Sequence, residues 1–380
     1  MRLNTSQYES MRTIAACAVG LALMVPAMFR LVGGDDDFRA FYRAANLARA
    51  RESVFAHPSF SPVTHADERY LPYNRIPSYA ASLERLASLP YPVARGIWTA
   101  ACVLAFFGCG RLFPARRDQF AIALAFSFPA ALALVLGTDI AFVLLIALAA
   151  ARIYSAEREF LAGLAASLLA IKFTYLPAAG VVFLAKSRRG SLGLAMGVAI
   201  QMAASFALQG IGWPWDYLAV LRKSMVAFDA RRMPNIRAVV TSLSLPGGIC
   251  WIGAILLFVW LWRACRRLSL PEALIVALPL GLIASPFCFI YDAVVLIPLL
   301  ASVASLSSWD GLLAGFLLTP IPWLLLMTGG SVALPMAGAL VVGSTVAAAV
   351  RFLRLRQTGA SCGFGLSRNV VMIQPDVRVY

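Results

Sequence analysis

The sequence GGDDDFRAFYRAANLARA runs from Gly33 to Ala50 and directly follows an apolar segment at about residues 13–32. The apolar segment is longer than the core of a typical signal peptide, so we expect a retained membrane helix. Three successive carboxylates, Asp35, Asp36 and Asp37, stand where this helix leaves the membrane. Carboxylates beside lipid are costly, which leaves two interpretations: a solvated cap of the following helix, or acid–base chemistry at the membrane surface.

The composition places the whole chain in a membrane. Hydrophobic residues make up 61% of the 380 residues and charged residues only 13%, whereas soluble domains carry about 25% charged residues. The apolar residues form runs of roughly 15–20 between short charged breaks, the pattern of a multi-spanning helical protein, without the alternation of an outer-membrane barrel. The net charge of +15 gathers at the ends of these runs, which indicates lipid headgroups rather than nucleic acid.

The residues that usually bind metals are scarce. None of the seven cysteines forms a CxxC pair, and the only two histidines are His57 and His65. A zinc or haem site needs more ligands than these, and carboxylate oxygens in the Asp35–Asp37 run are a weak indication of a metal. We therefore predict no required metal and no cofactor.

The apolar runs predict about twelve transmembrane helices in a single domain over residues 1–356, with a polar cytoplasmic tail at 357–380. The short basic turns then all fall on one side, and both ends of the chain are cytoplasmic. The predicted spans are 13–32, 93–112, 120–136, 139–153, 160–171, 174–185, 191–208, 248–263, 272–284, 289–304, 310–327 and 332–350.

Two large loops are predicted on the periplasmic side, at residues 33–92 and 209–244. The first contains a short helix at about Ala40–Arg51 with one apolar face, and we expect this helix to lie along the membrane surface. An ordinary loop helix that only packs against the protein is the alternative.

The polar residues that the topology gathers on the outer face form one group. Lys172, Asp139 and Asp292 lie where short helices meet, so we expect them to line a cavity below the membrane surface. Each has a structural alternative: Asp139 as a helix cap, Lys172 as an interfacial anchor, and Asp292 as a structural ion-pair partner. The alternative for the loop arginines is ordinary contact with lipid headgroups. The other members of the group are Asp35, Asp36, Asp37, Tyr70, Tyr73, Arg75, Arg231, Arg232, Asn235, Arg237 and Tyr291.

This set suits glycosyl transfer from a lipid-linked phosphosugar. A carboxylate of the Asp35–Asp37 run takes the proton from the acceptor hydroxyl, and cations bind the donor phosphate as it leaves. The candidate phosphate-binding residues are Lys172, Arg75, Arg231, Arg232 and Arg237. The candidate substrate-binding residues are Tyr42, Tyr73, Asn235, Tyr291, Asp292 and Asp139.

Several short motifs follow one another in a recognisable order. They are Asp37–Ala45 (DFRAFYRAA), Tyr70–Tyr73 (YLPY) with Trp98, Gly137–Thr138, Ala170–Pro177 (AIKFTYLP), Asn235, and Ser285–Asp292 (SPFCFIYD). With these motifs the chain resembles glycosyltransferase family 87, the polyprenyl-phosphate-mannose-dependent α-mannosyltransferases of the GT-C class.

The resemblance implies a GT-C type bundle in the inner membrane with its active site on the periplasmic side. It implies a polyprenyl-phosphate sugar as donor, with mannose as the sugar of the family, and a glycolipid or glycan as acceptor. Asp37 matches the catalytic carboxylate of the family's first outer loop, with Asp35 and Asp36 as neighbours that could substitute. The donor is a substrate, and no nucleotide-binding motif is present.

A secondary transporter or lipid flippase is the alternative function, because twelve spans with buried charges suit one. A transporter of this kind usually has two related halves with broken helices at matching positions, and the sequence has no such internal repeat. The large loop directly after the first span also favours an enzyme.

Overall fold

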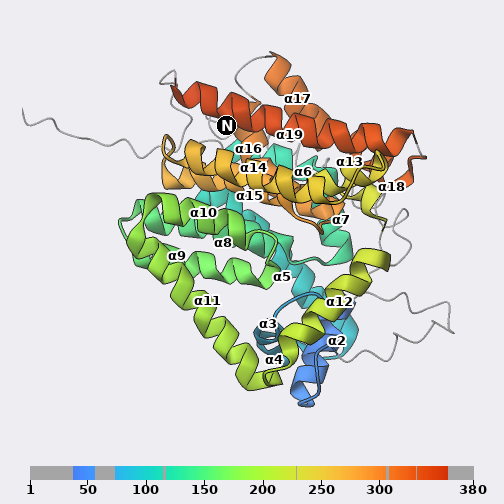
Figure 1. Ribbon diagram of the computed structural model, residues 1–380. Coiled ribbons are helices and arrows are strands. Elements are labelled where there is room, and N and C mark those ends of the chain that lie inside the picture. Colours follow the sequence, from blue (N-terminus) through green and yellow to red (C-terminus); the bar gives the residue numbers. More distant parts are fainter. Residues whose placement is uncertain are drawn as a thin grey trace, which may run out of the picture.

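A computed structural model describes residues 37–55, 73–113, 117–227, 229–304, 308–330 and 332–357. Throughout this part of the chain the secondary structure is helical, without strands, as the sequence predicts (Figure 1). The predicted first span, Asp35, Asp36, Tyr70 and the tail beyond residue 357 lie outside the described residues.

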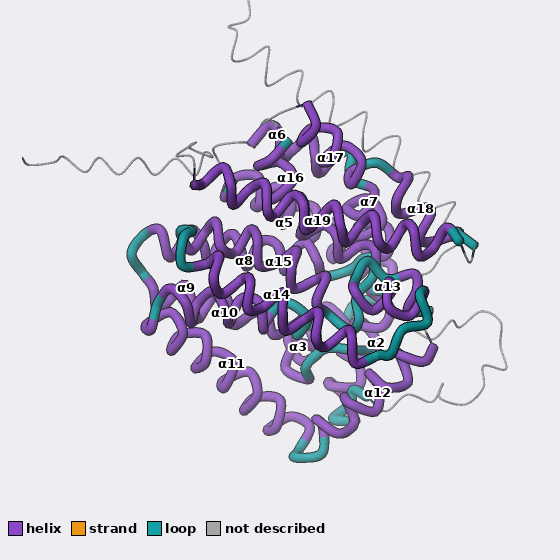
Figure 2. Tube along the Cα trace, turned by 45° about the horizontal axis from the view of Figure 1, so that its top comes forward, coloured by secondary structure: helices purple, strands orange, loops and turns teal. Residues whose placement is uncertain are grey.

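The two predicted loops contain short helices. In the first loop these are α2 (Phe38–Arg49), α3 (Pro77–Ser82) and α4 (Glu84–Ala87), and in the second they are α12 (Trp213–Ala227), η4 (Ala230–Arg232) and α13 (Ile236–Ser242). Figures 1 and 2 both show α2, α3 and α12 close together. The predicted surface helix is α2, which begins two residues earlier than expected. Its apolar face, with Phe41 and Ala44, is buried and faces α3, α4 and α5, so protein covers it.

Apolar helices make up the rest of the described chain. In order they are α5 (Tyr91–Leu112), α6 (Arg117–Ala125), α7 (Phe128–Leu136), α8 (Ile140–Ser155), α9 (Glu159–Ser167), η3 (Leu168–Lys172), α10 (Leu176–Lys186), α11 (Arg188–Gln209), α14 (Gly248–Cys265), α15 (Leu270–Ala284), η5 (Ile290–Leu296), α16 (Ile297–Val303), α17 (Ser308–Leu318), α18 (Pro320–Thr328) and α19 (Ala333–Gln357). Among the described helices, four are long and apolar enough to cross a membrane, or up to six spans if each bent pair counts as one. The count of twelve spans stays a prediction.

Two predicted spans are bent pairs of helices. The axes of α6 and α7 differ by 64°, and those of α17 and α18 differ by 44°. Pro129 and Pro320 stand at the first turns of α7 and α18, where proline is tolerated but cannot continue a preceding helix. Ser127 caps α7 by accepting a hydrogen bond of 3.3 Å from the amide of Ala130. Proline at these positions therefore explains both bends.

Two half-length helices meet at Lys172, as predicted. Helix α9 and the short η3 approach this point from one side, and α10 leaves it after a break at residues 173–175. Helices α9 and α11 pack closely through Gly163, where a Cβ atom would overlap the carbonyl oxygen of Gly190. Small residues allow such close helix packing in membranes, and this packing holds α9, from which η3 continues directly, against α11.

Several helices expose large apolar side chains on the outer surface of the bundle. On α14, Trp251 and Ile255 are 64% and 61% exposed, and on α5 Phe107 is 70% exposed. Contiguous apolar surface of this kind needs an apolar solvent or partner. The described helices thus belong to a membrane-embedded protein.

Candidate functional site

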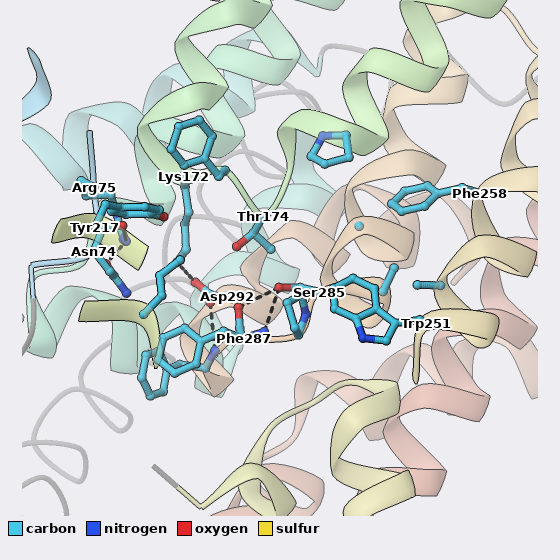
Figure 3. Close-up of a pocket in the computed structure, with 18 of the residues that line it drawn as sticks. Asn74, Arg75, Lys172, Thr174, Tyr217, Trp251, Phe258, Ser285, Phe287 and Asp292 are labelled. Carbon is cyan, nitrogen blue, oxygen red and sulfur yellow. Dashed lines mark hydrogen bonds and ion pairs between the residues drawn. The ribbon is translucent and has the colours of Figure 1, made fainter. Parts of the chain in front are cut away.

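The described helices enclose a cavity that is lined by both charged and apolar side chains. Its volume is about 430 Å³, and it lies between η3, α10, α12, α14, α15, η5 and the segment before α3. We call it the ion-pair cavity. Figure 3 shows Arg75, Asn74 and Tyr217 at one side, Lys172 and Asp292 in the middle, and Trp251 and Phe258 at the other side. It therefore has a charged end and an apolar end.

Lys172 and Asp292 form a buried ion pair at the charged end. The Lys172 ammonium contacts Oδ1 of Asp292, and both side chains are buried. Oδ2 of Asp292 accepts a hydrogen bond of 2.9 Å from the amide of Phe289, so this carboxylate also caps η5. The Lys172 nitrogen lies 5.1 Å from the centre of the Tyr291 ring. Lys172 thus lines the cavity, and its ammonium group pairs with a carboxylate inside the protein.

Arg75 and Asp139 form a second buried ion pair with two parallel bonds. Arg75 Nε lies 2.6 Å from Oδ2 of Asp139, and Nη2 lies 2.8 Å from Oδ1. Their side chains are only 5% and 0% exposed. Asp139 occupies the N-cap position of α8 but makes no side-chain capping bond. Its carboxylate is used to hold Arg75, so the hydrogen-bonded helix cap considered from the sequence is not found.

The turn before Asp139 explains where this carboxylate points. Gly137 ends α7 in the left-handed region, with φ of 67°, which glycine adopts without strain. Arg95 donates a 2.7 Å hydrogen bond to the carbonyl of Val135, and the Trp98 indole donates a 2.8 Å bond to the carbonyl of Gly137. A Cβ atom at Gly137 would lie 2.8 Å from Arg95 Cζ. The turn is therefore held rigidly from α5.

Asp37 lies beside both ion pairs. It occupies the N-cap position of α2 without a side-chain capping bond, and its carboxyl accepts a hydrogen bond from the Tyr291 hydroxyl. Burial raises the pKa of Asp37 to about 6, while the Tyr291 hydrogen bond and the charges of Lys172 and Arg75 act in the opposite direction. Tyr291 lines the cavity, so it connects Asp37 to the charged end.

Three of the five predicted phosphate ligands, Arg231, Arg232 and Arg237, do not line the ion-pair cavity. Arg231 is exposed and pairs with Asp229, its Nε lying 2.9 Å from Oδ1. Arg232 is exposed and donates to the carbonyl of Met327 at the end of α18. Neither side chain lines the ion-pair cavity. The structure does not bring them to Lys172 and Arg75.

Four predicted residues support the fold around the site. Tyr42 and Tyr73 donate hydrogen bonds of 2.8 Å and 2.9 Å to the carbonyls of Leu89 and Ile76. Asn235 caps α13 and donates a 2.8 Å bond to the carbonyl of Ser285.

Arg237 donates a 3.0 Å bond to the carbonyl of Pro286. Ser285 and Pro286 line the cavity, so Asn235 and Arg237 hold its wall.

Some cavity residues were not identified from the sequence as site residues. Asn74 from the first predicted loop and Tyr217 from the second both line the cavity. Trp251 and Phe258 lie within the apolar run of α14, where no feature of the pattern separates cavity-facing from lipid-facing side chains. Within the described ranges, no group of three or more His, Cys, Asp or Glu side chains could hold a metal ion.

Comparison with known proteins gives one match. The model of glycosyltransferase family 87 matches residues 77–286, more than half of the 380-residue chain. No curated protein and no solved structure matches the chain. The matched region contains Asp139 and Lys172, whereas Asp37, Arg75 and Asp292 flank it.

Proposed function

The chain belongs to glycosyltransferase family 87, and from this membership we propose that it transfers a sugar from a polyprenyl-phosphate donor to a glycolipid or glycan acceptor. The proposed site is the ion-pair cavity on the periplasmic side of the inner membrane, and mannose is the sugar proposed from the family resemblance. The donor and acceptor are substrates, and no cofactor takes part in the proposed reaction.

The amphipathic character of the ion-pair cavity is the observation that carries this proposal. Lys172 and Arg75 lie at one end, and Trp251, Ile255 and Phe258 lie at the other. Trp251 and Ile255 are also exposed on the outer, apolar face of α14. A phosphate near the cations and a prenyl chain along α14 would each meet a matching surface.

Asp37 is the proposed general base. The acceptor hydroxyl attacks the anomeric carbon of the sugar, a new C–O bond forms, and the bond from this carbon to the phosphate oxygen breaks. Asp37 takes the hydroxyl proton, and the polyprenyl phosphate leaves with its negative charge balanced by Lys172 and Arg75. A pKa of about 6 keeps the carboxyl mostly ionised at neutral pH yet more basic than an ordinary aspartate.

The two ion pairs are proposed to have different roles. Asp139 holds Arg75 through both carboxylate oxygens, which orients the guanidinium. Lys172 contacts only one oxygen of Asp292, whose other oxygen caps η5. The donor phosphate would therefore displace Asp292 from Lys172 more easily than it would displace Asp139 from Arg75.

This competition gives a testable difference between two variants. Asp292→Asn removes the charge that competes for Lys172, so the KM for the donor should stay the same or fall. Lys172→Met combined with Asp292→Asn removes the phosphate ligand without leaving a buried carboxylate unpaired. Its donor KM should rise about tenfold or more, because a hydrogen bond to a charged group contributes about 1.5–3 kcal/mol.

Steady-state transfer by purified protein, at several donor concentrations and one acceptor concentration, measures both KM values. An unchanged donor KM in the double variant would show that Lys172 serves only as the partner of Asp292.

The periplasmic location of the site predicts the sidedness of both loops. Single cysteines introduced at exposed loop positions, Arg51 and Arg231, should react with a membrane-impermeant thiol reagent in intact cells, because the basic turns place the other side inside. A cysteine at Arg267 serves as the control and should react only after permeabilisation. The opposite labelling pattern at the three positions would show that the predicted topology is inverted.

The cellular function is tested by mass spectrometry of envelope glycans and glycolipids from a deletion strain. A missing sugar that returns with the intact gene supports the proposal. Unchanged glycans together with altered solute uptake would favour the transporter.

A further inference from the structure

A second hollow follows the ion-pair cavity along α14. Its volume is about 630 Å³, and it lies between α10 and α14. Its apolar wall consists of Val181, Ile255, Phe258 and Val259, and its far end consists of Trp262, Arg263 and Arg266. We call it the arginine groove. It shares Ile255 and Phe258 with the ion-pair cavity, so the two hollows meet at these side chains.

The charges at the far end of the groove are unbalanced. Arg263 and Arg266 are exposed, and neither contacts a carboxylate of the described chain. Two arginines on α19 differ in this respect, because Arg351 pairs with Asp310 and Arg356 with Glu272. The arginine groove therefore offers two guanidinium groups to an external anion.

A third cation lies nearby. Lys186 is the last residue of α10, which packs against α14. The side chain of Trp262 lies on the same turn of α14 as Arg263 and is 37% exposed. Trp is enriched at the boundary between lipid chains and headgroups, and Lys and Arg are in excess in the cytoplasmic loops beside it.

We propose that the arginine groove binds an anionic phospholipid. Its phosphate lies between Arg263 and Arg266, whose planar donor groups match phosphate oxygens. One acyl chain follows Val259 and Phe258 along α14 toward the ion-pair cavity. The basic end of α14 is predicted to be cytoplasmic, so the lipid belongs to the leaflet opposite the proposed transfer site.

The apolar wall favours a lipid over a soluble phosphate. α14 is one of the helices long and apolar enough to span a membrane, and Val259 is 43% exposed on it. A basic pocket between membrane helices that opens to the lipid is a typical headgroup site. A free anion would leave the apolar part of the groove unused.

The test is native mass spectrometry of protein taken from vesicles of phosphatidylcholine with phosphatidylglycerol. We expect the unaltered protein to retain phosphatidylglycerol selectively. Arg263→Gln with Arg266→Gln should reduce this retention, by about fivefold for each arginine. Val259→Trp keeps both charges but fills the groove, and it should also reduce retention.

A charge-matched control separates the groove from general surface charge. Arg152→Gln with Arg354→Gln removes two exposed arginines on α8 and α19, outside the groove, and should leave retention unchanged. Equal loss in this control, or full retention in the Arg263/Arg266 variant, would overturn the proposal. Retention unaffected by Val259→Trp would show that only the surface charge binds, and would also overturn it. None of these outcomes depends on the glycosyltransferase reaction.

Discussion

Asp37→Asn is expected to lower sugar transfer by about 10²–10⁴-fold, the usual contribution of a positioned general base. The substitution keeps the size of the side chain and its ability to accept from the Tyr291 hydroxyl, but it removes the basicity. Because Asp37 makes no capping bond to α2, the helix should still form. The measurement is the single-turnover rate with purified protein at saturating donor and acceptor.

Asp35→Asn and Asp36→Asn are the matched controls for this variant, and their effects should be milder. A near-normal rate for Asp37→Asn, together with a large loss in Asp35→Asn or Asp36→Asn, would show that the neighbouring aspartate is the base. Near-normal rates for all three variants would show that Asp35, Asp36 and Asp37 form only a solvated helix end without a catalytic role.

The same carboxyl predicts how transfer depends on pH. The proposed base, Asp37, would accept a proton only when ionised, and burial raises its pKa to about 6. Transfer should therefore be fully active above this value and should fall as the pH drops through about 6. The Tyr291 hydrogen bond lowers the pKa, so Tyr291→Phe should move the acidic limb to higher pH. The charged groups that also act on Asp37 are Lys172, Arg75 and Asp139.

Asp139→Leu is expected to destabilise the protein by about 3–5 kcal/mol, the usual cost of removing one partner of a buried ion pair. The Arg75 side chain is only 5% exposed, and the substitution leaves its charge without a balancing carboxylate. The measurement is denaturant-induced unfolding in detergent micelles, with helicity as the signal.

The double variant Arg75→Leu with Asp139→Leu is the control. Replacing both partners of a buried pair by apolar residues is often neutral or stabilising, so the double variant should recover most of the lost stability. A single Asp139→Leu variant within 1 kcal/mol of the unaltered protein would mean that Arg75 does not depend on Asp139.

The sequence predicted the helical class and the placement of Lys172 because these depend on local patterns. Long apolar runs predict helices, and the break after Lys172 is visible as two runs too short to span a membrane. The bends at Pro129 and Pro320 also have a local signal in the proline that begins each second helix.

Contacts between distant segments could not be predicted in this way. The partner of Asp139 is Arg75, 64 residues earlier, and local reasoning suggested a helix cap. The contact between Asp37 and Tyr291 joins the start of α2 to η5, and no periodicity in either segment indicates it. Chain order puts Arg231 and Arg232 in the second predicted loop, but Asp229 and the end of α18 hold their side chains away from the cavity.

The measurement that tests the central claim most directly is a transfer assay with purified protein in lipid vesicles. One sample receives a polyprenyl-phosphate sugar labelled in the sugar, and the other receives the corresponding labelled nucleotide sugar, each with the same glycolipid acceptors. The account predicts label in the acceptor and an equal amount of polyprenyl phosphate in the first sample only, with both products lost in Asp37→Asn. Transfer from the nucleotide sugar, or transfer from the lipid donor that persists in Asp37→Asn, would contradict it.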